Sequence, residues 1–232
     1  VDMNDLFFSD EHLMLRDMVR EFAANEVAPV AAELDHEAIF PREIIEKMAE
    51  LGLMGIPIPE SLGGAGMDTV AYAATVMELA RADASVAITM AAHTSLGTMP
   101  IVIAGSEEQK KKFVPPLASG EMIGAFGLTE PDAGSDAGAT KTTAVKKGDE
   151  YILNGGKIFI TNVGEAGILN LTARVIEGDE DKGIGAFIIE TNTPGLIINP
   201  KEKKMGWCAS DTRQIFFEDM AVPAKNMLGT PR

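Results

Sequence analysis

Cysteine is almost absent from this sequence. Cys208 is the single cysteine among 232 residues, so the chain offers no partner for an internal disulfide and no second thiolate for a structural zinc site. The acidic N-terminal stretch "VDMNDLFFSDEHLM" lacks the positive charge that begins a secretory signal, and we find no arginine-rich transit segment. We therefore expect a reducing interior compartment and no bound metal.

Positive charge is also scarce. The chain carries 20 Lys and Arg against 35 Asp and Glu, which gives a formal net charge of −15 at pH 7. Binding of nucleic acid or of anionic lipid requires clustered positive side chains that neutralise phosphate. The only tight basic run, "QKKKF" at residues 109–113, is interpreted as the solvated face of a helix. We therefore predict no nucleic-acid partner and no membrane partner.

Charged residues are missing altogether between Asp83 and Glu107. This long uncharged stretch is interrupted by serine, threonine, histidine, glycine and proline, whereas a bilayer-spanning helix is more uniformly apolar. We predict a buried helix in the core of the protein. Within it, His93 is expected to be a core residue with satisfied hydrogen bonds rather than a base.

Hydrophobic residues make up 46% of the chain, and before residue 121 they recur three and four positions apart, which predicts helices with one buried face. Ser9 and Ser106 are the expected N-caps. Pro41 is expected at the first helical position and Gly52 just after a helix end, while the pair Pro115-Pro116 should end the last helix. The faces expected to be buried consist of Leu15, Met18, Val19 and Phe22, of Ile44, Met48 and Leu51, and of Ala73, Val76, Met77 and Ala80.

The pattern changes in the second half of the chain. Short runs rich in Ile, Phe and Val are separated by turn signals such as "KKGDE", "EGDEDKG" and "NTPG". No long helices alternate with these runs, which favours antiparallel strands over βαβ units. We predict an α+β fold of two domains: an all-α domain over residues 1–120, then an antiparallel β-barrel or sandwich of six to eight strands over residues 121–232.

The segment "GLTEPDAGSD", which begins at Gly127, concentrates polar and turn-forming residues after an apolar run. Thr129 and Ser135 offer hydroxyl groups, and Gly134 and Gly138, with Gly127, would permit positive φ and close approach of the backbone to a ligand. Such a loop suits a phosphate or an electron-rich ring, although a hydrogen-bonded turn without a ligand explains it equally well. It matches neither a Walker A loop nor a dinucleotide fingerprint.

A second segment, "GGKIFITNVG", follows later in the chain. Ile158 and Ile160 fall on one face of the expected strand by simple alternation. Phe159 and Thr161, together with Lys157, fall on the other face. An aromatic ring beside a hydroxyl could flank a flat ligand, and a cross-strand aromatic pair on a half-buried sheet is the alternative.

Together and in this order, the two segments resemble the flavin-binding signature of the acyl-CoA dehydrogenase family. The family pattern is a small residue, an aliphatic, Ser or Thr, Glu, two residues, a small residue, Gly, Ser or Thr, and Asp; "GLTEPDAGSD" meets every position, and Ala139 supplies the small residue expected three positions later. "NGGKIFITN" is similar to the next hallmark, and "KKMGWCASDTRQIFFEDMAVPAKNMLG" (203–229) to the third. "SLGGAG" and "DASVAIT" extend the resemblance to the first half, with the short-chain, butyryl-CoA-like members as the nearest type.

The resemblance implies FAD as the cofactor, held against the β-domain. Thr129 is expected near the pyrimidine edge of the flavin and Thr161 near N5, where a hydroxyl can orient the ring that receives a hydride. Ser135 is expected near the cofactor phosphates and the acyl-CoA substrate. The implied cofactor-binding residues are Phe126, Leu128, Thr129, Gly134, Ser135, Phe159, Ile160 and Thr161.

The implied reaction is α,β-dehydrogenation of a short-chain acyl-CoA to the trans-2-enoyl-CoA, with electrons passed to an electron-transfer flavoprotein. Family members normally continue into a second helical domain that carries the catalytic Glu and the oligomer core. No acid in this chain matches that base, and Glu130 is expected to be structural. We expect a fragment, or a partner chain that supplies the domain, within a homo-oligomer (a dimer or tetramer) located in the cytoplasm or, in a eukaryote, the mitochondrial matrix.

Other functions stay open at this point. The same fold would serve an acyl-CoA oxidase or a flavin monooxygenase, and the chain could be a non-catalytic accessory subunit that shapes a partner's site. Cys208 falls where many relatives place a basic residue, which puts any substrate contact there in doubt. It is interpreted as a small buried side chain rather than a reactive thiol.

Overall fold

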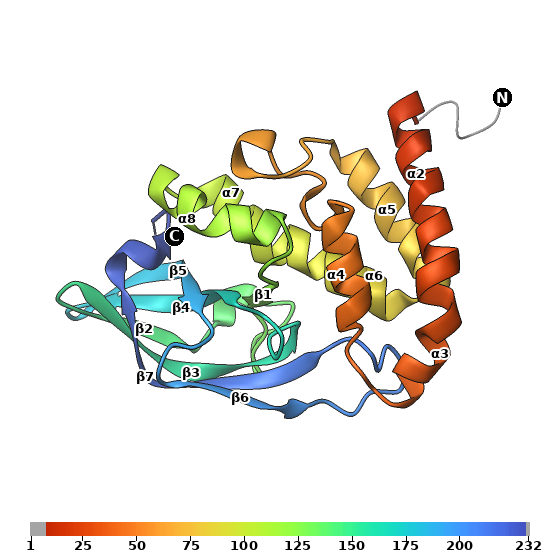
Figure 1. Ribbon diagram of the computed structural model, residues 1–232. Coiled ribbons are helices and arrows are strands. Elements are labelled where there is room, and N and C mark those ends of the chain that lie inside the picture. The colour runs from red at the N-terminus through yellow and green to blue at the C-terminus, as the bar shows by residue number, and fades with distance from the viewer. Residues whose placement is uncertain (1–7, 231–232) are drawn as a thin grey trace.

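The computed structural model describes residues 8–230 and consists of a helical half followed by a sheet half (Figure 1). The helices pack together on one side of the molecule, and the strands form the other side. This arrangement confirms the α+β prediction. The change from helix to strand falls between Ala118 and Gly124, while the division into two domains at residue 120 stays a prediction.

The helices begin where the sequence supplies a side-chain cap. Ser9 and Ser106 are the N-caps that the sequence predicts, and each forms a capping box with the third residue of the helix that follows. Asp68 and Asp83 accept backbone N–H groups at two further helix starts. The helices are α2 (Asp10–Phe22), α3 (Ala28–His36), α4 (Arg42–Glu50), α5 (Thr69–Ala82), α6 (Ala84–Ala92), α7 (Met99–Ala104) and α8 (Glu107–Ala118).

Two π-helical turns join consecutive helices into longer units. Ala23–Val27 connects α2 to α3, and His93–Thr98 connects α6 to α7. By length and composition, Ala84–Ala104 is the one stretch among the described residues that could cross a membrane, but more than half of it is buried inside the protein. It is the buried core helix that its uncharged sequence predicts.

Two expectations about proline are wrong. Helix α4 starts at Arg42, so Pro41 is the N-cap residue and not the first helical one. Helix α8 continues through Pro115 and Pro116 to its end at Ala118, although both prolines remove a backbone donor. Val114 and Leu117, on this same turn, are fully buried, and their packing outweighs the local preference. Gly52, as expected, follows the end of α4 with a positive φ of 73°.

The sheet half is one eight-stranded sheet with most neighbours antiparallel. Its order is β6-β7-β3-β2-β4-β5-β8, with β1 beside β4. Two pairs, β1–β4 and β2–β4, run parallel, which the antiparallel prediction missed. The strands are β1 (Gly124–Gly127), β2 (Thr143–Lys147), β3 (Glu150–Thr161), β4 (Ile168–Glu177), β5 (Glu180–Glu190), β6 (Leu196–Lys201), β7 (Thr212–Pro223) and β8 (Met227–Leu228).

Strands β1 and β2 share one edge of β4. β1 pairs with residues 168–171 of β4 and β2 with residues 174–176, while β5 occupies the opposite edge. The segment 128–142 therefore leaves the sheet between two strands and returns to the same neighbour. The strand β4 fixes both ends of this segment, which contains most of the "GLTEPDAGSD" motif.

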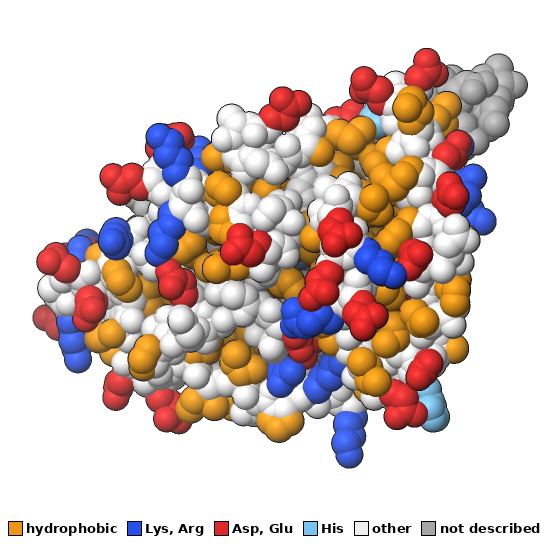
Figure 2. Space-filling view, in the orientation of Figure 1, with side chains coloured by type: hydrophobic (Ala, Val, Ile, Leu, Met, Phe, Trp, Pro, Cys, Tyr) orange, Lys and Arg blue, Asp and Glu red, His pale blue; other side chains and the backbone are white. Residues whose placement is uncertain are grey.

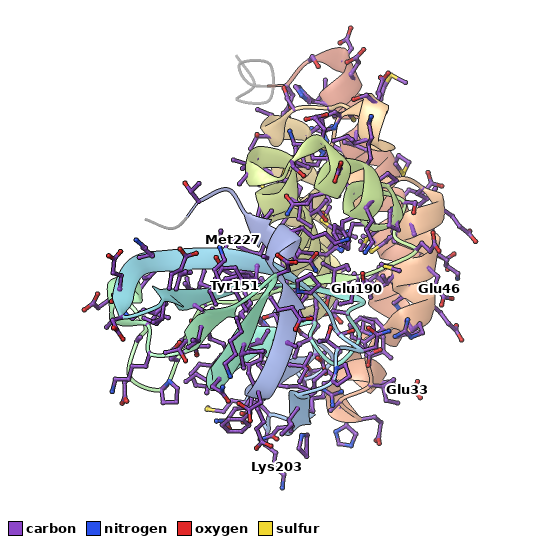
Figure 3. The ribbon with its side chains drawn as sticks, turned by 90° about the vertical axis from the view of Figure 1, so that its left-hand side faces the viewer. Glu33, Glu46, Tyr151, Glu190, Lys203 and Met227 are labelled. Carbon is purple, nitrogen blue, oxygen red and sulfur yellow. The ribbon has the colours of Figure 1, made fainter. Side chains whose placement is uncertain are left out.

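The sheet half has an apolar core of its own. Within this core, Tyr151 and Phe187 meet edge to face, with ring centroids 5.2 Å apart. The hydroxyl of Tyr151 donates to Glu177 Oε1 at 2.8 Å, so the one polar atom of this buried ring is satisfied. Figure 3 shows Tyr151 lying among the strands of the sheet half.

The junction between the halves is close-packed. A Cβ atom built on Gly97, in the π-helical turn, would lie 2.5 Å from backbone atoms of Gly124 in β1. The two backbone segments therefore approach each other closely at a pair of glycines. Asn170 of β4 donates its side-chain amide to the carbonyls of Leu96 and Gly97 at 3.0 and 2.7 Å. On the outer surface, Figure 2 shows acidic, basic and hydrophobic side chains interspersed over this face rather than one continuous charged patch.

Candidate functional site

The two motifs singled out in the sequence lie side by side. The backbone N–H of Ile158 in β3 donates to the carbonyl of Thr129 at 2.8 Å. Next to it, the Lys157 ammonium donates to the carbonyl of Leu128 at 3.0 Å. Strand β3 therefore holds two successive carbonyls of the loop segment, and it brings Thr129 next to the stretch that contains Phe159.

A buried ion pair underlies this contact. Lys157 Nζ lies 2.7 Å from Glu130 Oε1, with the two side chains 0% and 4% exposed. Glu130 also accepts the backbone N–H groups of Lys141 and Thr142 at 2.7 and 3.0 Å, so both its oxygens are occupied. Thr172 Oγ1, at 3.4 Å, completes the surroundings of the ammonium group. Glu130 is thus a structural acid, as expected, and is not free to act as a base.

The electrostatics of the pair follow from burial and hydrogen bonding. Burial by itself raises the pKa of Glu130, but the hydrogen bonds from Lys157 and from the backbone together hold the pKa of its carboxyl below the usual value. Burial lowers the pKa of Lys157, and the contact with Glu130 opposes that shift. The pair resembles many buried ion pairs in needing every partner: removing one charge would leave the other buried and unpaired.

Simple alternation along β3 is wrong beyond Lys157. Lys157 is fully buried and Ile160 is buried as well, although alternation places these two residues on opposite faces. A bulge between them supplies one extra residue, because Lys157 pairs with Ile215 and Ile160 with Arg213. Phe159 occupies the bulge with a positive φ of 59°, a conformation that is rare for an aromatic residue.

The bulge turns an aromatic ring outward. Phe159 is 63% exposed, whereas Thr161, two residues on, is half-buried and pairs with Thr212 of β7. The side chain of Ile160 lies in the sheet core, which leaves only its backbone groups for a ligand. A strained, exposed aromatic side chain at a strand bulge is typical of a binding surface.

The remaining predicted residues lie along the loop segment. Phe126, Leu128 and Thr129 are half-buried, and Gly134 and Ser135 are exposed. None of Gly127, Gly134 and Gly138 adopts the positive φ that glycine permits. Gly134 has open space where a Cβ would stand, so its position keeps the backbone accessible without a steric need for glycine.

We call the surface formed by these residues the shelf. It comprises Thr129, Gly134 and Ser135 of the loop segment, with Phe159 and Thr161 of β3, all of which are at least partly exposed. Within residues 8–230, no group of three His, Cys, Asp or Glu side chains could hold a metal ion. Glu130, the buried acid beneath the shelf, already accepts hydrogen bonds at both oxygens.

Sequence reasoning missed the residues that support the shelf. Alternation places Lys157 on one face with Phe159 and Thr161 and does not indicate its partner Glu130; a lysine directly before the apolar residues 158–160 is the available signal of a buried partner. Asn162 and Asn170, both fully buried, fasten the sheet to helix carbonyls. Asn162 ends the hallmark "NGGKIFITN", whereas nothing in the local sequence marks Asn170. Cys208 is half-buried rather than buried, with its N–H donated to Asp35 Oδ1 at 2.6 Å.

Two family models match this chain. Residues 9–121 match the family model described as "Acyl-CoA dehydrogenase, N-terminal domain", and residues 125–220 match "Acyl-CoA dehydrogenase, middle domain". The chain is 48% identical to the short-chain specific acyl-CoA dehydrogenase of Clostridium acetobutylicum over 97% of its own length and 59% of that protein. The chain thus spans less than two thirds of the curated relatives it matches.

Two solved structures share the fold closely. One, reported as the electron transferring flavoprotein of Acidaminococcus fermentans with a view to flavin-based electron bifurcation, contains a chain that is 45% identical with a TM-score of 0.93, over 100% of this chain and 60% of that one. The other is an acyl-CoA dehydrogenase complexed with FAD from Bacillus anthracis. It is 42% identical with a TM-score of 0.89, over 96% of this chain and 38% of that one.

Proposed function

Because this chain belongs to the acyl-CoA dehydrogenase family, we propose that it provides the flavin and substrate shelf of an enzyme that oxidises a short-chain acyl-CoA to the trans-2-enoyl-CoA. The single observation that carries the proposal is the contact between the two motifs, in which Ile158 and Lys157 hold the carbonyls of Thr129 and Leu128. This contact sets a hydroxyl-bearing loop beside an exposed aromatic ring. The relative from Clostridium acetobutylicum is described as short-chain specific, and this supports the acyl length.

The residues of the shelf fit FAD. Phe159 is 63% exposed, so a flat isoalloxazine can stack against its ring. Thr129 and Thr161 can donate hydrogen bonds to the ring edges, while Ser135 and the exposed backbone near Gly134 suit the phosphates. FAD would supply the acceptor for a hydride from the β-carbon.

The chain's own groups would act by binding and orientation. The hydroxyl of Thr161 would hold the ring edge in one orientation, and donors near Thr129 would stabilise negative charge that arrives on the pyrimidine side. Phe159 would exclude water from one face of the ring. The base that removes the α-proton is proposed to lie outside residues 8–230, because no acid in this chain matches the family's base and Glu130, the acid inside the motif, has both oxygens occupied.

We further propose a homo-oligomeric enzyme of the cytoplasm that delivers its electrons to an electron-transfer flavoprotein. The similarity to a chain in the structure from Acidaminococcus fermentans supports that acceptor. Anaerobic reduction of the complete enzyme by butyryl-CoA, followed by reoxidation with the flavoprotein or with oxygen, tests it. Faster reoxidation by the flavoprotein is expected, and rapid turnover with oxygen would favour an oxidase instead.

Flavin binding by the chain itself tests the shelf. Titration of FAD into the 232-residue chain should quench flavin fluorescence with weak, saturable affinity, since only part of the cofactor surface is covered. Phe159→Ala should reduce the quenching strongly. Phe216→Ala is the matched control, because this ring is also exposed on the sheet, at 37%, but lies on β7. Equal effects of the two variants would contradict the proposed site.

A further inference from the structure

We propose that Lys157 and Glu130 are positioning residues that hold the flavin-binding loop in its binding conformation before any cofactor arrives. The inference rests on the proposed function for the identity of the ligand, but the pre-formed loop is a property of the chain alone. The two residues come from different motifs, 27 positions apart, and their charged groups meet at 2.7 Å in a site that water does not reach.

The ammonium group of Lys157 connects the start of the loop to the sheet. Lys157 Nζ has three donors, and three acceptors surround it: the Leu128 carbonyl, Glu130 Oε1 and Thr172 Oγ1. Two of these belong to the loop and one to β4. A single cation therefore ties the start of the loop to the strands beneath it, and rotation of the Leu128 peptide would break a charge-assisted hydrogen bond.

The carboxylate of Glu130 connects the start of the loop to its far end. Glu130 accepts N–H groups from Lys141 and Thr142, at the far end of the same loop. Its own backbone exchanges hydrogen bonds with Ala133, at 2.9 and 3.2 Å. The side chain thus closes the loop across its base, while the backbone folds the turn that presents Gly134 and Ser135.

The position of Lys157 in β3 also affects the bulge that follows it. Lys157 lies directly before the bulge, so its fixed position sets where the extra residue falls and how Phe159 is turned. Thr129 and Phe159, the two sides of the shelf, are then placed by one ion pair. A loop that is already ordered loses less conformational entropy when a ligand binds.

A purely structural role makes a different prediction. A buried ion pair can often be replaced by neutral groups of similar volume without loss of stability. If Lys157 and Glu130 only fill space, the double variant Lys157→Met/Glu130→Gln should recover whatever stability Lys157→Met loses, together with every other property. If they position the loop, the fold recovers but the loop does not, because no group then holds the Leu128 carbonyl.

The experiment compares the wild-type chain, both single variants and the double variant. Thermal unfolding measures the fold, and amide hydrogen exchange of the chain without FAD measures the loop. We expect the double variant to melt close to the wild type, while the N–H groups of Glu130, Ala133 and Ile158 exchange faster. Lys146→Met is the matched control, because it removes a half-exposed ion pair with Glu177 from the neighbouring strand and should leave these amides unchanged.

Flavin readouts complete the test. The dissociation constant for FAD should rise about tenfold or more in the double variant, since reordering a few residues on binding costs free energy of that order. The visible absorption bands of the bound flavin should shift as well. Wild-type exchange, affinity and spectrum in a folded double variant would overturn the inference. If the wild-type chain binds no FAD, the proposed function fails here, and the exchange data still decide whether the pair holds the loop.

Discussion

The backbone N–H of Gly124 donates to Nδ1 of His93 at 2.9 Å, across the junction between helices and sheet. The other ring nitrogen, Nε2, therefore carries the proton and donates to the Leu117 carbonyl at 3.0 Å. His93 is fully buried and connects α8, the π-helical turn and β1 in one step. It is the satisfied core histidine that the sequence predicts, and the structure adds that it fastens the two halves together.

Stability should fall in mild acid because of this histidine. Burial lowers the pKa of His93 from 6.5 to about 4, so between these values the unfolded chain binds a proton that the native chain does not. The stabilisation is complete above pH 6.5 and is lost as the pH falls through 4, roughly 3 kcal/mol in total. Urea unfolding between pH 7 and 4 measures this loss.

A comparison of variants isolates the contribution of His93. His93→Gln should be less stable at neutral pH but should show a shallower loss between pH 6.5 and 4. His36→Gln, at a side chain 84% exposed, should reproduce the wild-type pH dependence. Parallel curves for all three proteins would show that the acid sensitivity arises elsewhere.

The contact between Gly97 and Gly124 should not tolerate a methyl group. A Cβ on Gly97 would stand 2.5 Å from the backbone of Gly124, so Gly97→Ala is expected to lower the free energy of unfolding by about 1–3 kcal/mol. Gly206→Ala is the control, because the same atom there meets nothing within 4 Å. Thermal melts of the two variants should differ clearly, and equal melting temperatures would show that the junction can relax.

Tyr151 should stay un-ionised well above the usual range for tyrosine. Burial, together with the hydrogen bond to Glu177, raises its pKa to about 12. The native chain therefore holds a proton that the unfolded chain releases near pH 10, and this stabilisation is lost as the pH rises through 12. Ultraviolet titration at increasing pH should show phenolate only together with unfolding. Tyr151→Phe should lower stability by about 1 kcal/mol through loss of one hydrogen bond.

The hydroxyl of Thr161 should influence a bound flavin directly. In the complete enzyme, Thr161→Val keeps the shape of the side chain and removes the hydrogen bond proposed near N5, so the flavin spectrum or reduction potential should shift. Thr143→Val, at a side chain of β2 outside the shelf, should change neither. An unaltered spectrum and potential in Thr161→Val would place the redox edge of the flavin elsewhere.

Much of the architecture follows from local sequence. The N-caps at Ser9 and Ser106, the stop at Gly52 and the buried uncharged helix all form as predicted. Each depends on contacts between residues close in the chain, or on an apolar stripe that only one face of a helix can bury. Not every local expectation holds, because Ala73, Met77 and Ala80, predicted on the buried face of α5, are exposed. Another failure has a non-local cause. Helix α8 continues through two prolines because Val114 and Leu117, on the same turn, are buried against residues distant in the sequence.

The sequence by itself determined the helical and sheet halves, the family, and the two segments that build the shelf, because hydrophobic period, caps and motif order are local properties of the chain. Only the tertiary structure decided that Lys157 turns inward to Glu130 and that a bulge turns Phe159 outward. One extra residue in a strand reverses the direction of every side chain after it. Its placement depends on pairing with β7, distant in the sequence, which alternation along a single strand does not encode.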